Sequence, residues 1–179
     1  MRPGDRLEAR FRAVADRRAT SVCVQQGTAR ATYGELEAMS NRVAHLLLEG
    51  GLGREDRVGI CMPKSIAAVA TMLGVLKAGG IYVPIDPRCP AARIATIVRD
   101  CAMATLVADA GPAADVLREL GLGSPLRTVY VAGPAATDPQ HDARLRAWDE
   151  HAAHPAEAPH CNAGPDLAYI LYTSGSTGK

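Results

Sequence analysis

The clearest periodic pattern in the chain predicts an amphipathic helix that follows Thr32. Its apolar residues recur three and four positions apart, as expected for one buried helix face: Leu36, Met39, Val43, Leu46 and Leu47. Thr32 and Glu35 have the spacing of a capping box, in which each side chain accepts a hydrogen bond from the other's backbone N–H group. Gly50 and Gly51 then provide a natural helix end.

Short apolar runs and helical patterns alternate along most of the remaining chain. We expect further helices over 5–18, 65–78, 90–101 and 113–120, and strands over 21–25, 57–62, 81–84, 105–108 and 127–131. The runs RTVYV and LAYILY are apolar without strict alternation, which is typical of parallel strands covered by helices on both faces. The pattern therefore predicts a layered α/β fold with a mostly parallel sheet flanked by helices.

Residues 132–165 interrupt this alternation. They are rich in Ala, Pro, Asp and His, and we expect only one short helix there, around 145–151. A connection of this length is unusual inside a compact domain. We therefore divide the chain into a β/α scaffold over 1–131, a surface connection over 132–165, and a final strand with the start of a loop over 166–179.

Composition excludes several classes of function. The formal net charge is +1 with no long basic run, which argues against binding to nucleic acid. No apolar run reaches the roughly 20 residues that cross a bilayer, and the N-terminus is polar, so we expect a cytoplasmic protein with no membrane partner.

The cysteines and histidines do not form a recognisable metal or disulfide pattern. The five cysteines are odd in number and none has Cys-x-x-Cys spacing. Cys61 stands in an apolar run and is expected to be a buried thiol. His151, His154, His160 and Cys161 gather in a stretch that we interpret as a solvated loop, so we expect no metal ligands.

The final stretch, TSGSTGK, has the composition of a phosphate-binding loop. Glycine lacks a Cβ atom and lets successive backbone N–H groups form a nest for an anion, and hydroxyl groups add further donors. The candidate ligand-binding residues are Thr173, Ser174, Gly175, Ser176, Thr177 and Gly178. The alternative is a flexible Gly/Ser linker, which the strand pattern directly before it disfavours. The stretch is not a Walker A loop, because that motif needs Gly where Thr173 stands.

Three stretches, in this order, resemble the adenylation domains of nonribosomal peptide synthetases, within the adenylate-forming ligase superfamily. Residues 32–36 (TYGEL) resemble the family's first signature, with Ala31 where a Leu is expected. Residues 76–86 (LKAGGIYVPID) resemble the second, with Ile81 in place of a small Ala. Residues 167–179 resemble the start of the phosphate-loop signature. The second stretch also favours the amino-acid-activating branch over acyl-CoA synthetases.

The resemblance implies the N-terminal part of the large domain of such a ligase. It implies activation of an amino acid with ATP and Mg²⁺ to an aminoacyl-adenylate, followed by transfer to the phosphopantetheine thiol of a peptidyl carrier protein beside other synthetase domains. The loop 173–178 would hold the departing phosphates, and no catalytic residue falls within this chain. We assign the first two stretches to the scaffold, with Lys77 expected on a solvated helix end.

The family pattern continues with Pro-Lys-Gly after the position of Lys179, so Lys179 is not expected to be the family's loop lysine. The later nucleotide-binding motifs, the substrate pocket and the C-terminal lid with its catalytic lysine have no counterpart in these residues. We therefore expect an N-terminal fragment of an adenylation domain that is inactive alone. The alternatives are part of another adenylate-forming ligase, acting on an aryl or fatty acid, and a non-catalytic truncated remnant.

Overall fold

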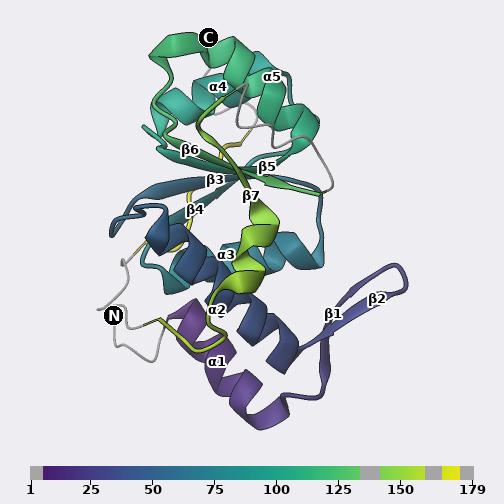
Figure 1. Cartoon of the computed structure of the whole chain (residues 1–179). Helices are drawn as coiled ribbons and strands as arrows, with labels where there is room; N and C mark the ends of the chain where they lie inside the picture. Colours follow the sequence, from purple (N-terminus) through teal and green to yellow (C-terminus); the bar gives the residue numbers. More distant parts are fainter. Residues whose placement is uncertain (1–5, 134–141, 160–166, 174–179) are drawn as a thin grey trace.

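A five-stranded parallel sheet forms the centre of the molecule (Figure 1). The computed structural model describes residues 6–133, 142–159 and 167–173. In spatial order the strands are β4 (Ile81–Pro84), β3 (Arg57–Cys61), β5 (Thr105–Asp109), β6 (Thr128–Ala132) and β7 (Leu145–Ala147). All four neighbouring pairs run parallel. The expected parallel sheet with flanking helices is thus confirmed.

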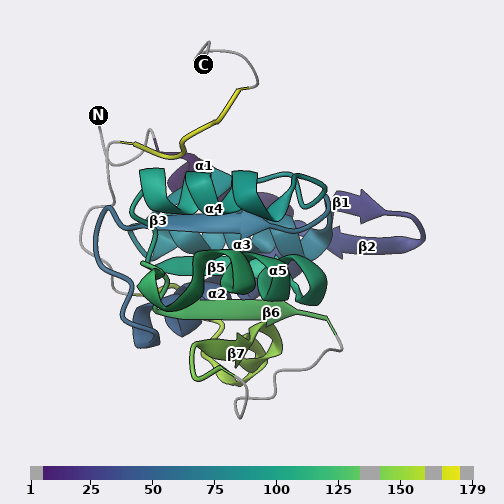
Figure 2. The ribbon, with the colours of Figure 1, turned by 90° about the horizontal axis from the view of Figure 1, so that it is seen from above.

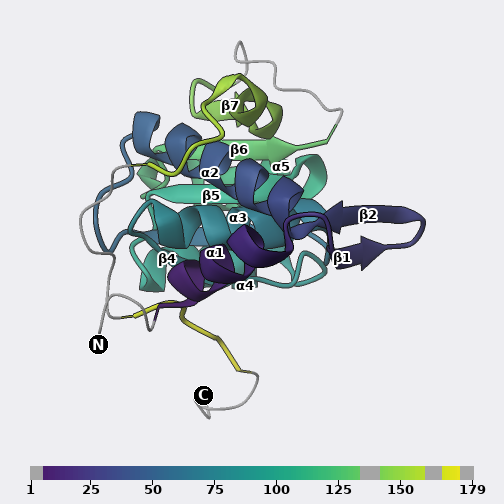
Figure 3. The same ribbon diagram turned by 90° about the horizontal axis from the view of Figure 1, so that it is seen from below.

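Helices cover both faces of this sheet, as Figure 1 shows. The first face carries α2 (Tyr33–Glu49) and α3 (Ile66–Lys77), and the second carries α4 (Ala91–Asp100) and α5 (Ala110–Leu120). Helix α1 (Leu7–Arg18) contacts α2 and α3 on their outer side (Figure 3). Each face of the sheet has its own apolar core, one against α4 and α5 and the other against α2 and α3.

Local signals place the boundaries of α2 and α3 where the sequence predicted them, whereas α5 begins at Ala110, before the expected residue 113. Thr32 and Glu35 form the capping box at the start of α2, and the Ser65 hydroxyl accepts from the Ala68 N–H group at the start of α3. Gly79, with φ of 82°, takes the left-handed conformation that follows α3. The strand expected over 21–25 is present as β1 (Val22–Gln26), whereas β2 (Ala29–Thr32) was not expected. A tight turn joins the two strands, and this hairpin projects from the body (Figure 2).

The short helix expected around 145–151 is found only in part within the described residues. Residues Leu145–Ala147 form β7 and pair with β6, and a 3-10 helix, η3 (Trp148–Ala153), follows. Trp148 is buried in the core below α2 and α3, and its indole N–H donates to the Thr71 hydroxyl at 3.1 Å. The long connection therefore adds a strand to the sheet and a large aromatic side chain to the core.

Two further expectations concern buried and membrane-spanning groups. Cys61 is fully buried, as expected, and burial raises the pKa of its thiol to about 12, so it stays protonated at neutral pH. Among the described residues, the helices lack the length and apolar character required to cross a bilayer.

Candidate functional site

The structure describes one residue of the candidate phosphate loop. Thr173 is exposed at the end of the segment 167–173. The other five candidates, over 174–178, lie outside the described residues, so their arrangement stays a prediction. What the structure does show is how the chain that leads into this loop is held.

The segment 167–173 attaches to the outer edge of β4 through a single residue. Tyr82 donates its N–H group to the carbonyl of Ala168 at 3.2 Å, and its own carbonyl accepts from the N–H group of Ile170 at 3.1 Å. The rings of Tyr82 and Tyr169 stack with their centroids 5.4 Å apart. Further along, the Tyr172 hydroxyl donates to Oδ2 of Asp100 at 2.9 Å, at the end of α4. The segment is therefore fastened to both β4 and α4.

This segment is not the doubly covered strand that its apolar sequence predicted. It forms one isolated parallel bridge, between Tyr82 and Tyr169. Ile170 and Tyr172 pack against the core on the α4 side, whereas Leu167, Tyr169 and Leu171 are 50%, 44% and 59% exposed. Buried and exposed side chains alternate because, within the described residues, one face of the segment packs on the core and the other face is largely exposed to solvent.

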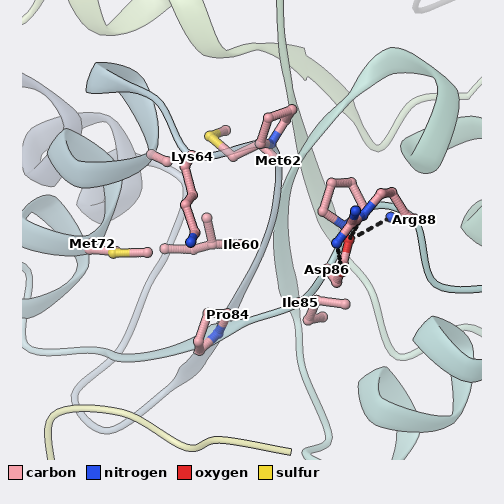
Figure 4. Close-up of a pocket in the computed structure, with 11 residues that line it drawn as sticks. Ile60, Met62, Lys64, Met72, Pro84, Ile85, Asp86 and Arg88 are labelled. Carbon is pink, nitrogen blue, oxygen red and sulfur yellow. Dashed lines mark hydrogen bonds and ion pairs between the residues drawn. The ribbon is translucent and has the colours of Figure 1, made fainter. Parts of the chain in front are cut away.

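A cleft of about 560 Å³ lies where β3 and β4 end (Figure 4). Its walls are mainly apolar and come from β3, α3 and β4 with their connecting loops. Its lining includes the apolar side chains of Ile60, Met62, Met72, Pro84 and Ile85 and the charged side chains of Lys64, Asp86 and Arg88. Within the described chain, no residue of the segment 167–173 lines this cleft, so the structure does not bring Thr173 to it.

Asp86 and Arg88 form a closed ion pair at one side of the cleft. Two nitrogens of the Arg88 side chain donate to the Asp86 carboxylate at 2.8 and 3.1 Å, and the Arg88 backbone N–H group donates at 2.9 Å. These donors hold the pKa of Asp86 at about 2. The carboxylate is therefore ionised at neutral pH and is already matched by its neighbour.

Lys77, expected on a solvated helix end, is instead buried between α2 and α3. Its ammonium group lies 2.7 Å from the Glu37 carboxylate and donates to the side-chain oxygens of Ser40 and Asn41, each at 2.7 Å. Burial lowers the pKa of Lys77, and Glu37 acts in the opposite direction. The sequence carried a signal for this: Lys77 is the one charged residue of an otherwise apolar helix, where a solvated helix shows a polar face.

The same polar cluster holds a segment that we call the strap, residues 148–159. Asn41 donates from Nδ2 to the carbonyl of Ala156 at 2.7 Å, and Nε2 of His45 lies 3.1 Å from the carbonyl of Glu157. Among the described residues, the chain pairs with the sheet at β7, at one edge, and again at β4, at the opposite edge. The strap covers part of that distance along α2, so α2 guides the chain toward the segment 167–173.

Metal ligation finds no support in the described residues, where no cluster of three potential ligand side chains occurs. Nδ1 of His151 lies 2.9 Å from the carbonyl of Trp148, and His154 lies 3.8 Å from Glu49. Both histidines thus have protein partners, while His160 and Cys161 lie outside the described residues.

Comparison with known families decides the class of the protein. A family model described as AMP-binding enzyme matches residues 9–179. The chain belongs to this family. Residues 32–36 and 76–86, together with the phosphate-loop stretch, all lie within the matched region, so the resemblance read from these three motifs is confirmed.

Relatives of this AMP-binding chain include a probable non-canonical nonribosomal peptide synthetase, CymA from Salinispora arenicola, which is 36% identical over 169 residues, 89% of this chain and 2% of that protein. A linear gramicidin synthase from Brevibacillus parabrevis is 39% identical over 152 residues, which are 82% of this chain and 2% of that protein. Syringomycin synthase SyrB1 from Pseudomonas syringae pv. syringae is 33% identical over 181 residues, which span 100% of this chain and 26% of that protein. The chain therefore corresponds to a small part of these relatives.

Solved structures confirm the fold of this AMP-binding chain. The anthranilate CoA ligase AuaEII, in complex with anthranoyl-AMP, superposes with a TM-score of 0.84 at 19% identity, over 94% of this chain and 32% of that one. The nonribosomal peptide synthetase FmoA3 superposes with a TM-score of 0.73 at 27% identity, over 94% of this chain and 16% of that one. FmoA3 has also been solved with AMPPNP bound.

Proposed function

We propose that the chain is the N-terminal part of an adenylation domain that activates an amino acid with ATP and Mg²⁺ for nonribosomal peptide synthesis. The observation that carries this proposal is the family match over residues 9–179, which extends through the TSGSTGK stretch. CymA, which is 36% identical, is described as a probable nonribosomal peptide synthetase, which supports the amino-acid branch. The acceptor of the activated amino acid would be the phosphopantetheine thiol of a peptidyl carrier protein.

In this proposal the loop 173–178 binds the phosphates of ATP. When bound, ATP supplies the phosphorus that the substrate carboxylate attacks, with pyrophosphate as the leaving group. The hydroxyl groups of Thr173, Ser174, Ser176 and Thr177 would donate to phosphate oxygens, and the glycines would let the backbone approach closely. Thr173 is exposed, so its hydroxyl is accessible to such a ligand. Mg²⁺ would arrive bound to the phosphates of the nucleotide.

We also propose that a polypeptide limited to residues 1–179 has no adenylation activity. The chain covers 16% and 32% of the two solved enzymes, and the resemblance places the substrate pocket and the catalytic lysine of the family in later segments. The second candidate is an aryl- or acyl-acid ligase, since the fold is shared by both branches of the family. The third is a non-catalytic remnant that keeps only nucleotide affinity.

Amino-acid-dependent exchange of pyrophosphate into ATP tests these proposals. We would sequence the coding DNA beyond the codon for Lys179 and assay both the 179-residue chain and any in-frame extension. The shorter chain should give the same signal as buffer, and an extended domain should respond to one amino acid. Exchange by residues 1–179 alone contradicts the inactivity proposal. Exchange with aryl or fatty acids favours the second candidate. If the coding DNA stops after the codon for Lys179, ATP affinity of the 179-residue chain without exchange favours the remnant.

Two threonine variants test whether the loop 173–178 contacts the phosphates of ATP. In an active extended domain, Thr177→Ala should lower kcat/KM for ATP about 10-fold or more, because a hydrogen bond to a charged group contributes roughly 1.5–3 kcal/mol. Thr28→Ala is the matched control, since Thr28 is an exposed residue in the turn between β1 and β2. Equal activity of the two variants would exclude a phosphate contact by Thr177.

A further inference from the structure

The cleft at the ends of β3 and β4 has the size and lining of a small-molecule site. Its volume of about 560 Å³ lies within the range of roughly 300–1,000 Å³ typical of ligand pockets, which are mostly apolar with a few polar groups. It also lies at the carboxyl ends of parallel strands, where α/β folds bind ligands. Neither the family match nor Thr173, the described residue of the candidate loop, accounts for it.

Strand register brings the charged members of the cleft together. Ile60 of β3 pairs with Pro84 of β4. Lys64 and Arg88 each follow four positions later, on the loops that leave these two strands. Because the strands are parallel, both loops emerge at the carboxyl ends of the strands, on the same side of the sheet. Residues that are 24 positions apart in the sequence therefore share one cleft.

Arg88 and Lys64, which both line the cleft, differ in whether a carboxylate pairs with them. Arg88 is engaged by Asp86, as described above. Among the described residues, Lys64 has neither an ion-pair nor a hydrogen-bond partner. Its side chain is exposed and extends toward Ile60 and Met72 (Figure 4). The cleft thus combines apolar walls with a single unmatched positive charge.

We propose that this cleft binds a small monoanion with an aromatic tail, whose charged group pairs with Lys64. One unmatched cation suits one negative charge, because a dianionic phosphate would leave a charge uncompensated beside apolar walls. Met62 and Met72 present thioethers, which adapt to irregular shapes and contact aromatic rings favourably. The site is separate from the segment 167–173 and does not depend on the proposed adenylation activity.

Calorimetric titration of the 179-residue chain with 4-phenylbutyrate tests this site. Two probes separate its parts: 4-phenylbutan-1-ol keeps the tail without the charge, and butyrate keeps the charge without the ring. The acid should bind about fivefold more tightly than the alcohol, the effect expected for a partly exposed ion pair. This preference should shrink as salt is added, because exposed charges are screened. Equal affinity for acid and alcohol, or no binding of the acid up to about 5 mM, would overturn the proposal.

Variants then locate the charge and the tail. Lys64→Met should remove the preference for the acid over the alcohol, whereas Arg30→Met, on the exposed hairpin strand β2, should leave it unchanged. Met72→Trp should weaken both probes by filling the cleft. Circular dichroism would confirm that each variant is folded. If Lys64→Met keeps the preference while folded, the anion binds elsewhere and the assignment is wrong.

Discussion

Nζ of Lys77 lies 2.7 Å from Oε2 of Glu37, with 6% and 15% of the two side chains exposed. This buried ion pair links α3 to α2, and Ser40 and Asn41 accept further hydrogen bonds from the same ammonium group. A buried charge is tolerated when a counter-charge and hydrogen bonds replace the water that it loses. The stretch LKAGG, which includes Lys77, therefore has an internal role in this fold, in packing α3 against α2.

Lys77→Met should lower the free energy of unfolding by about 3 kcal/mol, because it leaves the Glu37 carboxylate buried without a counter-charge. Urea titration measures this. Arg118→Met is the control: it breaks an exposed pair with Asp115 and should cost at most about 1 kcal/mol. The double variant Lys77→Met/Glu37→Gln should recover part of the loss. The prediction is wrong if Lys77→Met and Arg118→Met lower the free energy of unfolding by the same amount.

Asn41→Asp should loosen the strap selectively. Oδ1 of Asn41 accepts from Lys77 while Nδ2 donates to the carbonyl of Ala156, each at 2.7 Å. Aspartate keeps an acceptor for Lys77 but has no N–H group for Ala156. The backbone amides of His154, Ala156, Glu157 and Ala158 should exchange with solvent about fivefold faster, as expected from losing one hydrogen bond. Gln25→Ala, which removes an exposed side-chain bond to Gly27, should leave that exchange unchanged; unaltered exchange in Asn41→Asp would show that the strap is held elsewhere.

Gly50→Ala should destabilise the protein for a steric reason. Gly50 has φ of −69°, which any residue can adopt, but an added Cβ atom would collide with the Tyr130 hydroxyl, which donates to the Leu46 carbonyl at 3.1 Å. We expect a loss of roughly 1–3 kcal/mol on chemical unfolding. The cost should be smaller in a Tyr130→Phe background, where the colliding oxygen is gone.

Gly111→Ala is the matched control for that prediction. Gly111 lies in α5, and a Cβ atom there would meet nothing within 4 Å. Alanine should therefore stabilise the helix by up to about 1 kcal/mol through its higher helix propensity. If both glycine variants change stability in the same direction, close packing at Gly50 is not the cause.

Arg88→Met should raise the pKa of Asp86 from about 2 toward the ordinary value of 3.8. The side chain of Arg88 is the main cause of the depression, and its backbone N–H group, which the variant keeps, is the second. In the wild type this pair stabilises the fold at pH values above 3.8, and the stabilisation is lost as the pH falls toward 2. Carboxyl NMR titration measures the shift, and Asp142, which pairs with Arg144, should titrate as in the wild type. An unchanged Asp86 pKa would mean that the ion pair does not form in solution.

Local sequence signals predicted the helices and four of the five strands of the main sheet, because each depends on a few neighbouring residues. The capping box at Thr32, the Ser65 cap and Gly79 act within one turn of chain. The strand β7 was missed because its three residues carry little pattern of their own and are defined by pairing with β6. The candidate phosphate loop remains a prediction from its motif, while the cleft depends on the register between β3 and β4.

The sequence by itself determined the alternating elements, the fold class and the family resemblance, since periodicity and motifs are written in consecutive residues. Only the tertiary structure decided that Lys77 is buried, that Trp148 enters the core, and that Leu167, Tyr169 and Leu171 are exposed among the described residues. Burial depends on which distant segment packs over a side chain. That partner is chosen by the order of strands in the sheet and by the path of the strap, which no short stretch of sequence specifies.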